Sequence, residues 1–217
     1  MHRRTLLKRL ASIPALQFLS RFMQTKANAA DTERGQPIRR VRPSDPAWPA
    51  PEKWDKLKQE VGGNLIKVES PLAACQGAPD SDPCQQELIN LLNPYYIGDQ
   101  PGATQSAGWV DAWTSAPSAY AVAARSTADV VAAVNFAREN NLRLVVKGGG
   151  HSYQGTSNAA DSLLIWTRGM NRIAIHEAFI AQGCSGSQPP QPAVTVEAGA
   201  IWMDAYDEVT TNHGRYV

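Results

Sequence analysis

The chain has 217 residues, enough for one or two domains, and its 43% hydrophobic content is that of an ordinary globular protein. The 21 Lys and Arg side chains nearly balance the 20 Asp and Glu side chains, for a formal net charge of +1. This balance excludes a general attraction to nucleic acid or to an anionic membrane, so any polyanion must be bound locally. The six tryptophans are spread along the chain and predict packing rather than a base-stacking platform.

Residues 1–30 are typical of an export signal. Arg3 and Arg4 form a twin arginine followed by apolar residues, which resembles the signal of the Tat export machinery. The apolar stretch is too short and too charged for a membrane span, and the small residues at 27–30 suit signal cleavage. We expect a periplasmic or secreted mature chain that begins near Asp31 and has no membrane span. A basic amphipathic helix that stays attached is the alternative.

Residues 31–92 predict a leader and an N-terminal helical segment. The leader, 31–51, is rich in Pro, Arg and polar residues and predicts an extended segment outside the core. Apolar residues at helical spacing predict a first helix over 52–61. A second helix is expected over 83–93, stopped by Pro94.

Three cysteines suit an oxidising compartment if two of them pair. Cys75 and Cys84 bracket a turn-rich loop that a disulfide would close, which leaves Cys184 without a partner. The histidines after residue 150 are scattered and no second cysteine pair accompanies them, so no metal site is predicted.

The middle of the chain predicts a strand, a helix and a second strand. Residues 120–126 form a short apolar strand candidate, and 126–141 have the apolar spacing of a helix with Ser126 as its N-cap and Asp129 as the acidic capping partner. Residues 142–148 are rich in β-branched residues and predict the second strand. This order is the pattern of a parallel crossover unit.

The last third of the chain predicts three more strands and a helix. The strands are expected over 162–167, 172–179 and 193–202, the last running into a turn at Gly199, with a loop of Gly, Ser and Pro at 180–192. Helical spacing predicts the helix over 202–214.

A glycine-rich loop follows the strand that ends near residue 148. Gly148, Gly149 and Gly150 remove three side chains in a row, so that several backbone N–H groups can converge on one phosphate. The loop opens at the carboxyl end of a strand, where open α/β sheets bind ligands. No helical pattern follows Gly155, so this is not the Rossmann fingerprint. The residues alone leave a nucleotide phosphate loop and a structural bend both open.

His151 stands directly after the glycines and before the small hydroxyl residue Ser152. These surroundings allow an imidazole to reach a ligand that the same loop holds, as a nucleophile or as a proton carrier. A structural histidine is the alternative.

The stretch VVKGGGHSYQGTS, 145–157, resembles the signature of FAD-linked oxidases with a vanillyl-alcohol-oxidase-type (PCMH-type) FAD-binding domain, most closely the berberine-bridge-enzyme-like group. The residues around it agree in order, at 126–153 and again at 193–209. The resemblance implies an α+β FAD-binding domain of two subdomains over 93–217, the second apparently truncated.

The resemblance also implies a set of cofactor contacts. The residues that it places at FAD are Lys147, Gly148, Gly149, Gly150, His151, Ser152 and Gly155. Main-chain N–H groups of the loop would hold the pyrophosphate, and His151 matches the histidine that bonds covalently to the flavin 8α-methyl group. Cys184 lies too early to be the second, cysteine link, and no catalytic base is assigned.

The function implied is that of an exported FAD-dependent oxidoreductase of alcohol, sugar or amine-like substrates, with hydride passing to the flavin. The substrate would bind a further domain after residue 217, so we expect this chain alone to be inactive. Two alternatives stay open: a non-catalytic remnant, and a non-covalent flavin or nucleotide binder in which His151 is structural.

Overall fold

The computed structural model describes residues 39–216 except 107, 115 and 185, and residues from Arg40 onward form one compact unit. The expected export signal, 1–30, lies outside the described residues. Within the described part of the chain, no helix is long and apolar enough to cross a membrane.

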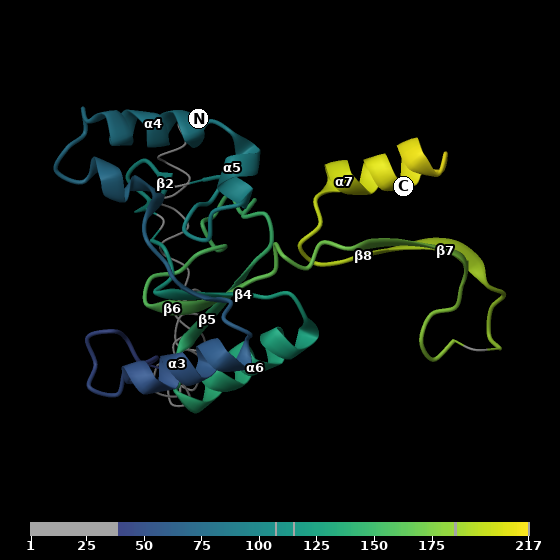
Figure 1. The fold of residues 1–217 in the computed structure, drawn as a ribbon, viewed down its shortest axis with the longest axis horizontal. Helices are drawn as coiled ribbons and strands as arrows, with labels where there is room; N and C mark the ends of the chain where they lie inside the picture. Colours follow the sequence, from purple (N-terminus) through teal and green to yellow (C-terminus); the bar gives the residue numbers. More distant parts are fainter. Residues whose placement is uncertain (1–38, 107, 115, 185, 217) are drawn as a thin grey trace, which may run out of the picture. The chain divides into compact units, whose positions relative to one another are not determined.

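A four-stranded sheet lies at the centre (Figure 1). Its strands, in spatial order, are β1 (Leu65–Lys67), β4 (Tyr120–Ala123), β6 (Ser162–Trp166) and β5 (Arg143–Lys147). β4 and β5 are both parallel to β6, which lies between them, and β1 is an antiparallel edge strand. The expected crossover is therefore present, with β6 inserted between its two strands. The almost fully buried sequence SLLIW of β6 is typical of a strand covered on both faces.

One face of the sheet is covered by α3 (Pro51–Glu60) and α6 (Thr127–Glu139), which pack side by side (Figure 1). The predicted capping box of Ser126 and Asp129 begins α6, because the side chain of each residue accepts the backbone N–H of the other. Trp54 of α3 stacks on Tyr120 of β4 with ring centroids 4.0 Å apart. The helix that the sequence placed in an N-terminal segment thus belongs to the core of the same unit.

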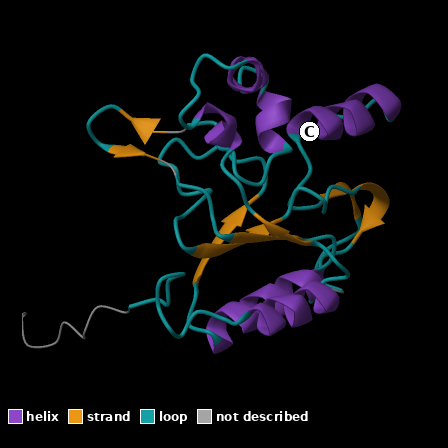
Figure 2. Cartoon of the chain, turned by 60° about the vertical axis from the view of Figure 1, so that its left-hand side comes forward, coloured by secondary structure: helices purple, strands orange, loops and turns teal. Residues whose placement is uncertain are grey.

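Short helices lie on the opposite side of the sheet (Figure 2). They are η1 (Pro71–Cys75), α4 (Asp82–Asn90) and α5 (Pro94–Gly98). The helix expected over 83–93 is present as α4, but it ends three residues earlier, at Asn90, and a second helix that was not expected begins at Pro94. Pro94 occupies the first turn of a new helix, where its missing N–H costs nothing, and the Asn93 side chain accepts the Tyr95 N–H at 3.0 Å as the cap.

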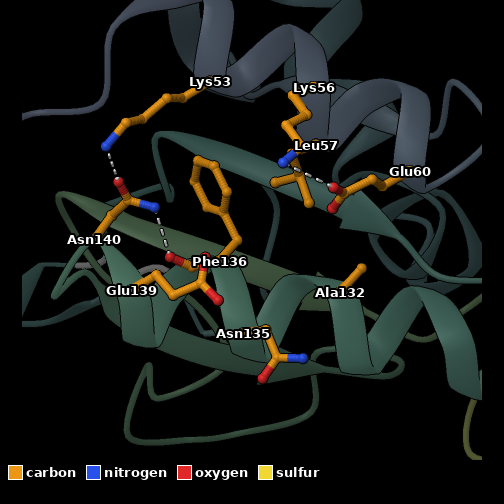
Figure 3. Close-up of a pocket in the computed structure, with 9 residues that line it drawn as sticks. All are labelled: Lys53, Lys56, Leu57, Glu60, Ala132, Asn135, Phe136, Glu139 and Asn140. Carbon is orange, nitrogen blue, oxygen red and sulfur yellow. Dashed lines mark hydrogen bonds and ion pairs between the residues drawn. The ribbon is translucent and has the colours of Figure 1, made fainter.

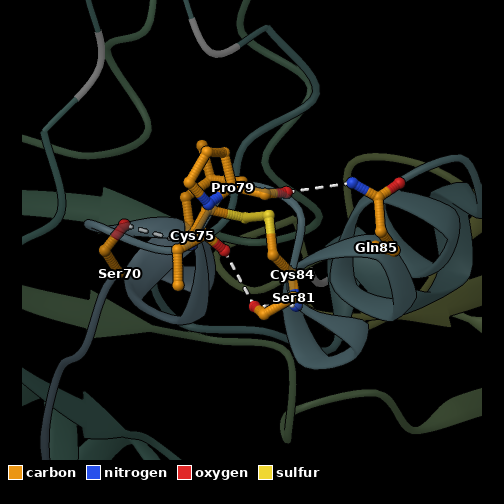
Figure 4. The surroundings of a disulfide bond; sticks show 8 residues. Ser70, Cys75, Pro79, Ser81, Cys84 and Gln85 are labelled. Carbon is orange, nitrogen blue, oxygen red and sulfur yellow. Dashed lines mark hydrogen bonds between the residues drawn. A yellow bond between two sulfur atoms is a disulfide. The ribbon is translucent and has the colours of Figure 1, made fainter.

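The predicted disulfide between Cys75 and Cys84 is present and joins η1 to α4 (Figure 4). The two Cα atoms lie 4.6 Å apart across the turn-rich loop. Cys184 is a free cysteine, as expected.

The remaining strands form two hairpins. They are β2 (Gly108–Trp109) with β3 (Trp113–Thr114), and β7 (Ile173–Phe179) with β8 (Gln191–Val196). After β8 the chain turns at Gly199, as expected, and the Gly199 N–H donates to the Met170 carbonyl at 2.7 Å. The strand itself ends earlier than expected, at Val196. The predicted C-terminal helix is present as α7 (Trp202–Tyr206), continued by the π-helix η2 (Asp207–Asn212).

Candidate functional site

The glycine loop lies at the carboxyl end of β5, as the sequence predicts. Gly150 and Gly155 have φ angles of +79° and +68°, a backbone region in which other L-residues are strained. At Gly155 a Cβ would also overlap the ring of Trp113. These two positions therefore require glycine, and they fix the two ends of the turn that carries His151.

The loop presents a row of unused donors. Among the described residues, the amide N–H groups of Gly149, Gly150, His151 and Ser152 donate to no protein acceptor. The Ser152 hydroxyl oxygen instead holds the following turn, since it accepts the amide N–H of Thr156 at 3.2 Å. Consecutive free N–H groups form a concave anion site, and they are costly to bury unless a ligand accepts them.

The imidazole of His151 is held by Gln105. Its Nδ1 lies 2.8 Å from the amide oxygen Oε1 of Gln105, and the backbone N–H of Gln105 donates to the Gly150 carbonyl at 3.0 Å. Because an amide oxygen can only accept, the contact requires the hydrogen on Nδ1, and a neutral ring then has its lone pair on Nε2. Sequence reasoning missed Gln105, which lies 46 residues before His151.

Lys147 is buried below the loop, with 2% of its surface exposed. Its ammonium donates to the carbonyls of Gln100, Pro101 and Ala103 at 2.7, 2.6 and 2.9 Å. Burial lowers the pKa of Lys147 to about 7, and the carbonyl acceptors, which favour the charged form, act against that shift. Any role of this side chain at the cofactor is therefore indirect: it ties the segment that leads to Gln105 to the end of β5.

A cavity of about 240 Å³ opens beside the loop. Gly149 and His151 line it from the loop, Arg168 lines it from the turn after β6, and apolar residues of α5 and of the α7 region complete it. The cavity thus has an apolar wall, a cation and an imidazole, and two residues of the glycine loop, Gly149 and His151, line it. This combination suits a flat aromatic ring joined to a phosphate.

A larger cavity, of about 390 Å³, lies between α3 and α6 and shares no lining residue with the first (Figure 3). Its charged groups have protein partners: Lys53 donates to the Asn140 side chain at 2.9 Å, and Lys56 lies 3.8 Å from Glu60. We assign no function to it.

Residues 117–216 match the family described as an FAD binding domain. Among curated proteins, the FAD-linked oxidoreductase malF of Malbranchea aurantiaca is 32% identical over 195 residues, 81% of this chain and 33% of the relative. The FAD-linked oxidoreductase easE of Claviceps fusiformis is 27% identical, over 77% of this chain and 32% of the relative. The chain spans about a third of the length of the curated relatives it matches.

Solved structures agree. The VAO-type flavoprotein MtVAO615 of Myceliophthora thermophila C1 superposes with a TM-score of 0.67 at 25% identity, over 80% of this chain and 34% of that one. MtVAO713 of the same organism superposes with a TM-score of 0.69 at 21% identity over the same shares. The expected α+β class is confirmed.

Proposed function

We infer that this chain carries an FAD-binding domain of the VAO-type FAD-linked oxidoreductase family. We propose that the loop from Gly148 to Ser152, closed by Gly155, holds the pyrophosphate of FAD. The observation that carries this proposal is the row of N–H groups from Gly149 to Ser152 that have no protein acceptor in the described part of the chain. Once bound, FAD supplies two-electron oxidation chemistry, while the loop supplies position and charge stabilisation.

We further propose that His151 is the covalent anchor. A ring nitrogen would bond to the 8α carbon of the flavin in place of one methyl hydrogen. That hydrogen and the imidazole hydrogen leave as protons, and the two electrons pass through the flavin to an external acceptor such as dioxygen. His151 lines the same cavity as Gly149, and its contact with Gln105 fixes the ring plane, which supports this assignment.

For the whole protein we propose oxidation of an alcohol, sugar or amine-like substrate in the periplasm or outside the cell. The substrate would be bound mainly by a further domain, because the chain spans a third of its relatives. The twin arginine and the disulfide between Cys75 and Cys84 support export to an oxidising compartment.

The test is to express the chain, precipitate it with acid and measure flavin in the pellet, alone and with its natural downstream sequence. We expect flavin that stays with the protein and maps to the His151 peptide, and none in His151→Ala. Flavin that binds but is released by acid would mean that the domain binds FAD non-covalently. No flavin in any form would overturn the proposal.

A further inference from the structure

Among the residues that line the 240 Å³ cavity, Arg168 carries a permanent positive charge. It lies two residues after the end of β6 and lines the same cavity as Gly149 and His151. The other cation near the loop, Lys147, has its ammonium on three backbone carbonyls. Arg168 is therefore the side chain of this cavity that can pair its positive charge with a negatively charged group of a ligand.

The guanidinium of Arg168 is held on two sides. Its Nε donates to Asp99 Oδ1 at 2.9 Å, and its Nη1 donates to the Gly199 carbonyl at 3.1 Å. The Arg168 side chain is 18% exposed and the Asp99 side chain 57% exposed. A guanidinium has five N–H donors, so these contacts orient the group and leave donors for a ligand.

We propose that Arg168 binds phosphate oxygens of the dinucleotide alongside the free N–H groups of the loop. The inference rests on the proposed function. A planar guanidinium matches phosphate geometry, and a side chain already fixed in place loses little entropy on binding. Asp99 then has a second role: its negative charge competes with the phosphate for Arg168.

The first test compares ligands with and without phosphate, on the full chain, by titration calorimetry and flavin fluorescence. Arg168→Gln is expected to weaken FAD and ADP about 10–100-fold and to leave riboflavin unchanged, because one charge-assisted contact is lost. The affinity for ADP should also become less sensitive to salt. Arg168→Lys should recover part of the loss.

Arg172→Gln is the matched control. Arg172 lies on the same turn, pairs with Glu197 at 3.4 Å and has a side chain that is 74% exposed, outside the cavity lining. This variant removes the same charge and is expected to leave ADP affinity unchanged. An equal loss in both variants would mean that net charge, not Arg168, controls binding, and would overturn the inference.

Asp99→Asn separates binding from structural support. It breaks the ion pair but keeps the guanidinium, so a phosphate-binding Arg168 predicts equal or tighter ADP binding. If Arg168 only braces the fold through this pair, Asp99→Asn will weaken ADP as much as Arg168→Gln does, and the inference fails. Wild-type protein that binds neither FAD nor ADP would overturn the proposed function itself, and this inference with it.

Discussion

The cavity between α3 and α6 and the cavity beside the glycine loop differ in the hydrogen-bond partners of their polar groups. The larger one, between α3 and α6, is lined by lysine, glutamate and asparagine side chains, several of which pair with one another. The smaller one adjoins four consecutive N–H groups without a protein acceptor in the described chain, and a cation with donors to spare. Donors without a protein acceptor, rather than volume, are the reason that we propose the smaller cavity as the binding site.

The largest effect on FAD binding is expected from Gly149→Val. A Cβ at Gly149 would stand 2.8 Å from Nε2 of His151, so the side chain would displace the imidazole and fill the approach to the N–H groups. We expect FAD affinity to fall about 100-fold, the equivalent of one or two charge-assisted hydrogen bonds. Flavin content after gel filtration measures the effect.

The matched change in the larger cavity is Asn135→Ala. Asn135 lines that cavity and is exposed, so we expect no change in flavin content. A similar loss of flavin in both variants would mean that the comparison between the cavities is wrong.

Lys147→Met compares the two regions by their effect on the stability of the fold. The change leaves the three carbonyls that accept from the ammonium without a donor, and we expect the free energy of unfolding to fall by about 2–3 kcal/mol. Lys53→Met at the larger cavity removes one exposed contact and should change stability by less than about 0.5 kcal/mol. Urea denaturation measures both, and equal effects would show that the three carbonyls do not depend on Lys147.

The stability should also depend on pH. The pKa of Lys147 is lowered from 10.5 to about 7, so above pH 7 the unfolded chain holds a proton that the folded chain has lost. Stability of the wild type relative to Lys147→Met should therefore rise between pH 7 and pH 10, by at most about 1.4 kcal/mol per pH unit. Measuring the stability difference between the wild type and Lys147→Met at each pH isolates the contribution of Lys147. A relative stability that stays constant over this range would show that the carbonyl contacts offset burial and that the pKa of Lys147 is not lowered.

The parts of the fold that depend on local pattern could be predicted from the sequence. Ser126 and Asp129 predict the start of α6. The glycines predict a turn, and at Gly150 and Gly155 that turn has the positive φ angles that favour glycine. The helix α5 was not expected, because Pro94 can either end a helix or begin one and was interpreted only as an end.

The supporting contacts of the site could not be predicted. Gln105 reaches His151 across 46 residues and Arg168 reaches Asp99 across 69, and no periodicity links such positions. The resemblance places Lys147 at FAD, and in the structure the alternation of β5 turns its side chain toward the backbone of residues 100–103.

The most direct measurement is an NMR titration of the ¹⁵N-labelled full chain with ADP. The amide signals of Gly149, Gly150, His151 and Ser152 should shift, together with the side-chain signal of Arg168, while Lys53 and Asn135 at the larger cavity stay unchanged. Loop signals that do not move at saturating ADP, or shifts confined to the cavity between α3 and α6, would contradict the assignment of the phosphate site.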